Sequence, residues 1–365
     1  MPRNTVARID TDALRHNYRL ACRLASPARV MAVIKADGYG HGIQEVARAL
    51  AGEAPKFAVA CIEEALAIRE AGVGHPVVLL QGMHCAGDVA TCAREDFEVV
   101  LHSDYQLEWL ERADQVPTLW LKVNTGMNRL GFPPAALAEV MARLENHASE
   151  HRMVGFVTHY ACADDPASGF TDEQTRVFTE AVVDWPSLEK SAANSAAHFL
   201  PGQPLFDLSR PGIMLYGASP MLEKTGPHLG LKPVMTLEAP LTAVRILEPG
   251  QAVGYGCSWR AERETRMGIV AIGYGDGYPR HAGTDTPAWV AGSRIRLIGR
   301  VSMDMLAVDL TNAPEASEGD TVELWGKNVS VDEVAQHAGT IAYELLTGIT
   351  ARVPRLYDNT VDHGG

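Results

Sequence analysis

The sequence predicts an α/β protein in two parts: a (β/α)8 TIM-type barrel over residues 9–233 and a mainly antiparallel β domain over residues 234–365. Two observations predict this division. In the first part, eight short apolar runs alternate with helical patterns, which is the arrangement of a parallel barrel. From about Val234 the helical patterns nearly vanish, and alternating stretches separated by turn signals follow, as in an antiparallel sheet.

The expected barrel strands are short and rich in apolar and β-branched residues, because such strands are buried on both faces. In chain order they are 30–34, 57–60, 77–80, 98–101, 118–123, 153–157, 189–193 and 205–208. Apolar residues at helical spacing follow or precede most of them. The expected helices begin at residue 12 and continue with 43–51, 63–70, 105–112, 133–146 and 172–183.

The second part has a different pattern of elements. Alternating strands are expected at 241–247, 267–272, 294–298, 305–310 and 321–325, and two short helices at 331–336 and 343–346. Pro249-Gly250 and Glu318-Gly319-Asp320 are turn signals between strands. The first residues, 1–8 and on to Asp10, are a candidate additional strand of this domain.

Composition narrows the class of partner. The net charge of −13 argues against binding to nucleic acid or to an anionic membrane. The six cysteines form no C-x-x-C pair, which argues against a zinc ribbon or a thioredoxin motif. Residues 1–5 lack an apolar signal core, and no apolar run reaches transmembrane length. We therefore expect a cytoplasmic protein with free thiols.

Lys35 stands at the carboxyl end of the first expected strand, before the Gly-rich run Asp37-Gly38-Tyr39-Gly40-His41-Gly42. This run is neither a Walker A loop nor a Rossmann fingerprint. A half-buried lysine at this place would have a lowered pKa and could act as an amine nucleophile or a base. A lysine that ends a strand and extends to water is an equally good account of this stretch alone.

Polar residues also follow four later strands, and in a barrel all of these positions meet at the carboxyl-terminal rim, where active sites lie. They are Lys122 and Arg129, His159, Asn194 with Ser195, and Arg210 with Gly212 and Ile213. The last two groups occupy the usual phosphate site of such barrels. No Asp/His cluster accompanies them, so we expect no catalytic metal.

Each of these residues also has a purely structural explanation. His159 alone could be a core histidine, Arg129 a loop cation, and Asn194-Ser195 a helix cap. Lys122 could simply lie at the rim. Their joint occurrence at strand ends favours a site, provided that the strands are correctly placed.

Longer motifs resemble bacterial alanine racemase over nearly the whole chain and in the same order. They are Ala-Val-Ile-Lys-Ala-Asp-Gly-Tyr-Gly-His-Gly around Lys35, Lys-Val-Asn-Thr-Gly-Met-Asn-Arg-Leu-Gly from Lys122, Ser-Arg-Pro-Gly-Ile-Met-Leu-Tyr-Gly from Ser209, Val-Gly-Tyr-Gly around Tyr255, Gly-Tyr-Gly-Asp-Gly-Tyr-Pro-Arg from Gly273, Gly-Arg-Val-Ser-Met-Asp from Gly299, and Tyr343-Glu344 with Ala-Arg-Val-Pro-Arg. No single motif would suffice, but the set is specific.

The resemblance implies a fold type III pyridoxal 5'-phosphate enzyme that racemises alanine as a homodimer with shared active sites. Lys35 would bind the cofactor covalently and act as the base on the D-alanine side, and Tyr255 of the other subunit would act on the L-alanine side. Arg210 would face the pyridine nitrogen, and Arg129 and Met303 would contact the substrate. Residues around the cofactor and its phosphate would be Tyr39, His159, Asn194, Ser195, Gly212, Ile213 and Tyr343. Lys122 matches a position that is carbamylated in some members.

Two departures from the family pattern, Asp37-Gly38 and Asn124, lie beside these residues, and the second leaves modification of Lys122 open. Three alternatives follow from the same features: a fold type III amino-acid decarboxylase, a non-catalytic cofactor carrier with a single barrel, and a racemase of broader range. Val-Gly-Tyr-Gly disfavours the first, and the β domain disfavours the second. The third stays open, as does the choice between D-alanine supply for peptidoglycan and alanine catabolism.

Overall fold

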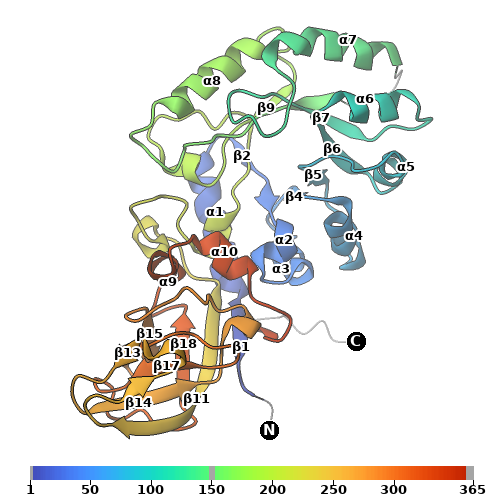
Figure 1. Cartoon of the computed structure of the whole chain (residues 1–365). Coiled ribbons are helices and arrows are strands. Elements are labelled where there is room, and N and C mark those ends of the chain that lie inside the picture. The colour runs from blue at the N-terminus through green and yellow to red at the C-terminus, as the bar shows by residue number, and fades with distance from the viewer. Residues whose placement is uncertain (1–2, 148–152, 359–365) are drawn as a thin grey trace.

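The computed structural model describes residues 3–147 and 153–358 (Figure 1). It has the two predicted parts, a parallel α/β barrel and an antiparallel β domain, which lie at opposite ends of the view in Figure 1. The predicted fold class is therefore confirmed. Residues 1–2 and 359–365, which the sequence assigned to the β domain and its extra strand, lie outside the described residues.

The barrel is a ring of parallel strands. Seven of them form one sheet in the order β3-β4-β5-β6-β7-β8-β9, and strand β10 (Leu208–Ser209) pairs with β2 (Arg29–Val30). Backbone bonds from Asp207 N–H to Lys190 O (3.0 Å) and from Arg210 N–H to Ala193 O (2.8 Å) join β9 to β10 and close the ring. The bounds are β3 Ala32–Val33, β4 Phe57–Val59, β5 Val77–Leu79, β6 Phe97–Leu101, β7 Thr118–Lys122, β8 Met153–Val157 and β9 Glu189–Ser191.

Helices surround the barrel strands. They are α1 Thr11–Ala25, α2 Lys35–Tyr39, α3 Ile43–Leu50, α4 Ile62–Glu70, α5 Gly87–Arg94, α6 Asp104–Glu111, α7 Leu137–His147 and α8 Phe170–Ala181. The Asp10 carboxylate caps α1 by accepting the Ala13 N–H at 2.9 Å. Helix α5 was not predicted, because only Val89 and Cys92 of its eight residues are buried, so it shows little apolar spacing.

The eighth strand lies later in the chain than predicted. It covers Leu208–Ser209, whereas the sequence placed it at 205–208. The backbone of Phe206 has a φ of 57°, in the left-handed region, which a strand cannot include. The apolar residues before β10 therefore belong to the turn that leads into it.

The β domain is one mixed sheet in the order β14-β17-β16-β15-β18-β11-β1-β19, closed on itself because β14 also pairs with β11. Strand β1 (Val6–Asp10), from the start of the chain, lies between β11 and β19. The other bounds are β11 Met235–Leu247, β12 Ala252–Val253, β13 Trp259–Arg260, β14 Thr265–Val270, β15 Pro287–Val290, β16 Ser293–Leu297, β17 Leu306–Asp309, β18 Thr321–Trp325, α9 Val331–Ala338, α10 Ala342–Thr347 and β19 Arg355–Asp358.

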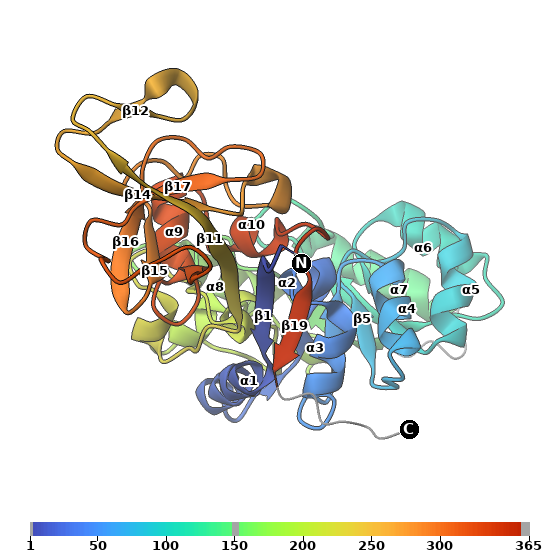
Figure 2. The ribbon, with the colours of Figure 1, turned by 90° about the horizontal axis from the view of Figure 1, so that it is seen from below.

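Two features of this domain bear on the site. Helix α10 lies beside α2 at the carboxyl end of the barrel, so the two parts meet next to Lys35 (Figure 1). The hairpin of β12 and β13 projects from the β domain on the side away from the barrel (Figure 2). Within the described ranges, every helix is too short or too polar to cross a lipid bilayer.

Candidate active site

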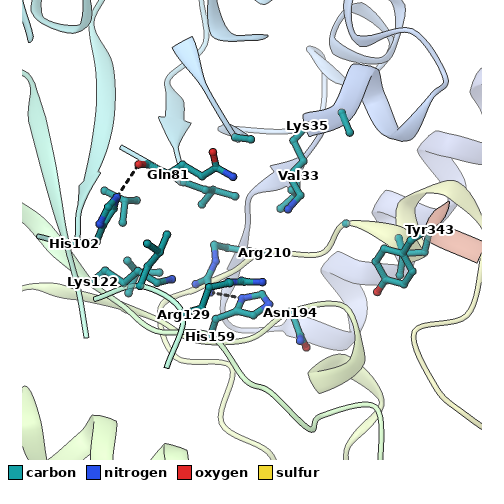
Figure 3. A pocket seen from close by; sticks show the side chains of 18 of the residues that line it. Val33, Lys35, Gln81, His102, Lys122, Arg129, His159, Asn194, Arg210 and Tyr343 are labelled. Carbon is teal, nitrogen blue, oxygen red and sulfur yellow. Dashed lines mark hydrogen bonds between the residues drawn. The ribbon is translucent and has the colours of Figure 1, made fainter. Parts of the chain in front are cut away.

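A cavity of about 940 Å³ opens at the carboxyl end of the barrel strands. It brings together eleven of the thirteen residues that the sequence singled out, and Figure 3 shows several of them around one space. The eleven are Lys35, Tyr39, Lys122, Arg129, His159, Asn194, Ser195, Arg210, Gly212, Ile213 and Tyr343. Ten come from barrel strand ends and their loops, and Tyr343 comes from helix α10.

Lys35 begins a left-handed turn. The residues after it, Ala36 to Tyr39, all have φ between 52° and 60°. Left-handed backbone costs roughly 1–2 kcal/mol for each residue that carries a Cβ. Such a turn persists only where its surroundings determine it, and strain of this kind concentrates at functional sites.

Glu64 of helix α4 holds the start of this turn. One oxygen of its carboxylate accepts the Ala36 N–H and the other accepts the Ala60 N–H, each at 2.7 Å. The same carboxylate thus ties the ends of the first two barrel strands together. Burial lowers the pKa of the Lys35 amine, the Arg129 cation lowers it further, and Glu64 opposes the shift.

Arg210 is buried beneath the cavity and is held by oxygen atoms of the barrel strands. Its guanidinium donates to the Ser191 hydroxyl, to Thr158 O and, at 3.2 Å, to Ala192 O. One of its nitrogens also lies 3.4 Å from Nδ1 of His159 (Figure 3). Arg210 has only donors, so this ring nitrogen must be the acceptor.

The cavity gathers four cationic side chains that no salt bridge among the described residues neutralises. In the part of the chain that the structure describes, Lys35, Lys122, Arg129 and Arg210 form no salt bridge. Burial and the neighbouring cations, Arg210 first, lower the pKa of Lys122 to about 7. The same causes hold the pKa of His159 well below its usual value, which keeps the ring neutral. A site of this charge is suited to an anionic ligand.

The predicted phosphate site is formed by residues from the last two strand ends. The Ser195 hydroxyl accepts the N–H groups of Gly212 (2.8 Å) and Met214 (3.4 Å), which joins the two loops. The Tyr39 hydroxyl lies over Gly212, where a Cβ would come within 2.2 Å of it. Asn194 accepts the Ala197 N–H at 3.2 Å, so it caps the short helical turn that follows. Asn194 therefore has both roles that the sequence left open: it caps a helical turn and it lines the cavity.

Tyr255 and Met303 are the two predicted site residues that do not line the cavity. Tyr255 lies in the loop between β12 and β13, on the projecting hairpin, and its side chain is 73% exposed. Met303 is 53% exposed on the β domain. Within one chain, these residues and the cavity belong to separate surfaces.

Part of the cavity wall was not predicted from the sequence. Gln81 and His102 follow strands β5 and β6, and the His102 ring donates from Nε2 to Gln81 O at 2.9 Å (Figure 3). His84 and Tyr105 also line the cavity. The strand-end argument that selected His159 would have selected His102 as well. No group of three or more His, Cys, Asp or Glu side chains among the described residues is arranged to hold a metal ion.

Family models match both parts of the chain. The alanine racemase N-terminal domain matches residues 9–220, and the alanine racemase C-terminal domain matches residues 234–357. The chain belongs to the alanine racemase family. The resemblance that the sequence motifs indicated is therefore confirmed.

Individual relatives of this family align over almost the full length. The alanine racemase of Marinobacter nauticus is 66% identical over 358 residues, which covers 98% of this chain and 100% of the relative. The crystal structure of the biosynthetic alanine racemase of Pseudomonas aeruginosa superposes with a TM-score of 0.94 at 46% identity, covering 98% and 100% of the two chains. The alanine racemase of Bartonella henselae, solved with covalently bound pyridoxal phosphate, has a TM-score of 0.87 at 30% identity, covering 98% and 100%.

The lowered pKa of Lys122 predicts how stability depends on pH. Between pH 7 and 10 the unfolded chain binds a proton that the folded chain has released, so the stability of the cofactor-free protein rises with pH in this window. We expect Lys122→Met to raise the melting temperature at pH 7 by about 2–4 °C, the effect of about 1 kcal/mol in a domain of this size. The pH dependence between 7 and 10 should also become flatter. Thermal unfolding in CO2-free buffer measures both.

Lys327→Met is the matched control, because Lys327 is an exposed lysine of the β domain. It should change neither the melting temperature at pH 7 nor the pH dependence. An unchanged pH dependence in Lys122→Met would contradict the assignment of this proton to Lys122.

Proposed function

We propose that the protein interconverts L-alanine and D-alanine by a two-base mechanism with pyridoxal 5'-phosphate as its cofactor. The observation that carries the proposal is the position of the Lys35 amine. The amine lies at the end of a barrel strand, and its pKa is lowered. It faces a cavity whose cations form no salt bridge with any described residue, in a chain of the alanine racemase family.

The residues of the cavity fit this cofactor. The phosphate and the phenolic oxygen of this cofactor are anionic. The cations of the cavity can neutralise these groups, and its hydroxyl groups can donate hydrogen bonds to them. Lys35 would hold the cofactor covalently, and Tyr39, Ser195, Gly212, Ile213 and Tyr343 would surround the phosphate, with Asn194 and His159 beside them. When bound, this cofactor stabilises the negative charge left on the α-carbon after a proton has been removed.

Racemisation requires a proton acceptor on each face of the α-carbon. Lys35 serves one face: burial favours its neutral form, so its nitrogen can accept the α-proton of D-alanine and return it. Tyr255 serves the opposite face and acts on L-alanine. Arg129 binds the substrate carboxylate, and the backbone of Met303 contacts it as well.

Arg210 would face the pyridine nitrogen as a hydrogen-bond donor. Burial lowers its pKa to about 10, so it remains protonated at neutral pH. A protonated guanidinium has only hydrogen-bond donors and does not readily transfer a proton, so it would not protonate the pyridine nitrogen. We propose that it keeps the pyridine ring uncharged, which limits the spread of negative charge into the ring and disfavours transamination.

We propose a homodimer in which each cavity receives Tyr255 and Met303 from the partner chain. Both residues are exposed within one chain, and Tyr255 lies on a projecting hairpin. Further large apolar side chains of the β domain and of the segment around helix α10 are exposed as well, which is typical of a surface that a partner covers. They are Tyr274, Met305, Ile341 and Tyr343.

Three further assignments belong to the same proposal. Because the pKa of Lys122 is about 7, about half of its amines are neutral at pH 7, and the neutral amine is the form that reacts with carbon dioxide. A carbamate on Lys122 would orient Arg129. Residues 9–233 and 234–365 act as a barrel that binds the cofactor and a β domain that completes the site. The enzyme works in the cytoplasm and supplies D-alanine for peptidoglycan, as the word biosynthetic in the name of its Pseudomonas aeruginosa relative suggests.

A chiral assay over a panel of amino acids tests the reaction and the alternatives. We expect racemisation of alanine well above that of any other amino acid, and no decarboxylation. Lys35→Ala should remove the absorbance of the covalently bound cofactor and lower the rate by at least about 10³-fold, because one base and the covalent link are lost. Retention of both in a folded Lys35→Ala protein, shown by circular dichroism, would refute the role of Lys35.

Tyr255→Phe tests the second base. The substitution removes only a hydroxyl, so α-deuterium exchange from L-alanine should fall by roughly 10²-fold or more, and exchange from D-alanine far less. Each enantiomer is incubated separately in deuterated water, and the label is followed by mass spectrometry. Equal losses for the two enantiomers would argue against assigning Tyr255 to one face.

Mixing two inactive variants tests the shared site. A dimer with one Lys35→Ala chain and one Tyr255→Phe chain has one cavity with both bases intact, so activity should return. Random exchange of equal amounts yields heterodimers as about half of the dimers, each with one of two sites active, so recovery should approach a quarter of the wild-type activity. No recovery after subunit exchange has been verified by mass spectrometry would exclude the shared site.

A further inference from the structure

The Gly-rich run after Lys35 packs against the β domain. A Cβ on Gly40 would lie 2.1 Å from the backbone oxygen of Leu346, and a Cβ on Gly42 would lie 2.0 Å from the hydroxyl of Tyr357. Both glycines also have positive φ. The absence of a side chain at Gly40 and Gly42 therefore allows the β domain to pack directly against the run that follows Lys35.

Two side chains of the terminal strand β19 bind this run directly. Arg355 donates from Nε to Gly40 O at 3.1 Å, and the Tyr357 hydroxyl donates to His41 O at 3.0 Å. The remaining guanidinium nitrogens of Arg355 donate to the backbone oxygens of residues 349, 350 and 353. In residues 3–147 and 153–358, Arg355 has no carboxylate partner. Arg355 therefore links the backbone of the Gly-rich run to the backbone of residues 349–353 in the β domain.

The turn is also held from within by His41, which is fully buried. Its Nδ1 lies 2.8 Å from Tyr39 O and 3.0 Å from Gly38 O. Because both neighbours are carbonyl oxygens, Nδ1 must carry the hydrogen. Nε2 has no hydrogen-bond partner among the described residues, and burial lowers the pKa of the ring to about 4, so His41 stays neutral near pH 7.

These contacts stabilise a backbone conformation that is unfavourable by itself. The left-handed turn from Ala36 to Tyr39 includes three residues that carry a Cβ, and it directly follows Lys35, whose amine must reach the cofactor. Glu64 fixes its first N–H, His41 its last carbonyls, and β19 the segment that follows. A loosened turn would move the Lys35 amine directly, whereas the phosphate site takes only Tyr39 from the turn and is otherwise formed by the loops after β9 and β10 and by Tyr343.

We infer that Tyr357 and Arg355 of strand β19 are positioning residues for Lys35, which hold the strained turn and thereby place the amine for covalent attachment of the cofactor. This inference rests on the proposed function. In the attachment, the Lys35 nitrogen forms a double bond to the aldehyde carbon of pyridoxal 5'-phosphate, and the aldehyde oxygen leaves as water.

Two ligands separate the placement of the amine from the integrity of the cavity. Pyridoxamine 5'-phosphate has the same ring and phosphate as pyridoxal 5'-phosphate but no aldehyde, so it cannot be attached to Lys35. We expect Tyr357→Phe to weaken binding of pyridoxal 5'-phosphate to the cofactor-free protein by about fivefold, the effect of one hydrogen bond. Binding of pyridoxamine 5'-phosphate should weaken less, because it depends on Tyr39 and the phosphate loops but not on attachment to Lys35. Absorbance and fluorescence titrations measure the two affinities.

Tyr18→Phe is the matched control. The Tyr18 hydroxyl donates to Val30 O at 3.0 Å, so the substitution deletes an equivalent bond at the other end of the strand that leads to Lys35. It should lower the melting temperature without changing the ratio of the two affinities. Arg355→Lys, which loses the Nε–H bond to Gly40, is a second test and should change the ratio in the same direction as Tyr357→Phe.

The outcomes separate the two levels of the proposal. A wild-type protein that does not attach pyridoxal 5'-phosphate would contradict the proposed function itself. A wild-type protein that attaches it, together with an unchanged ratio of affinities in both β19 variants, would overturn the positioning role alone. An equal loss for both ligands would also overturn it, because that result describes general damage to the cavity.

Discussion

The arrangement of this molecule depends on a group of cations that are kept close together and form no salt bridge within the described part of the chain. Lys35, Lys122, Arg129 and Arg210 repel one another, and burial removes the water that would screen the repulsion. The fold must therefore hold them in place by other means. Arg210 is held by three oxygens of neighbouring strand ends, and Lys122 responds by releasing its proton readily. An anionic ligand completes such a cavity electrostatically.

The barrel positions these residues because parallel strands all end at one rim, so the strand-end positions could be found from the sequence alone. Lys35, Lys122, His159 and Arg210 lie where that argument placed them. His102 also follows a barrel strand and lines the cavity, but it was not predicted, because it lies in none of the motifs that resemble alanine racemase. By contrast, the eighth strand begins three residues later and ends one residue later than predicted, since a left-handed residue inside an apolar run leaves no trace in composition.

Two aspects of the site could not be derived from local patterns. Tyr255 follows no barrel strand, and only the family resemblance connected it with Lys35; its place on an exposed hairpin leaves its role as a proposal. The left-handed turn after Lys35 was also hidden. Asp37-Gly38 indicated a turn, but the conformation of Ala36 and Tyr39 depends on contacts with α4 and β19, which are distant in sequence.

The dependence of that turn on β19 also bears on why the second domain exists. A single barrel could supply the lysine and the phosphate site, as the hypothesis of a non-catalytic carrier assumed. Here, however, the terminal strand β19 pairs with the first strand β1 and then reaches back to Gly40 and His41. The first and last strands of the described chain thus meet beside the lysine loop. If Lys35 attaches the cofactor as proposed, the attachment would depend on both domains, because the residues that hold its turn include Arg355 and Tyr357 of the β domain.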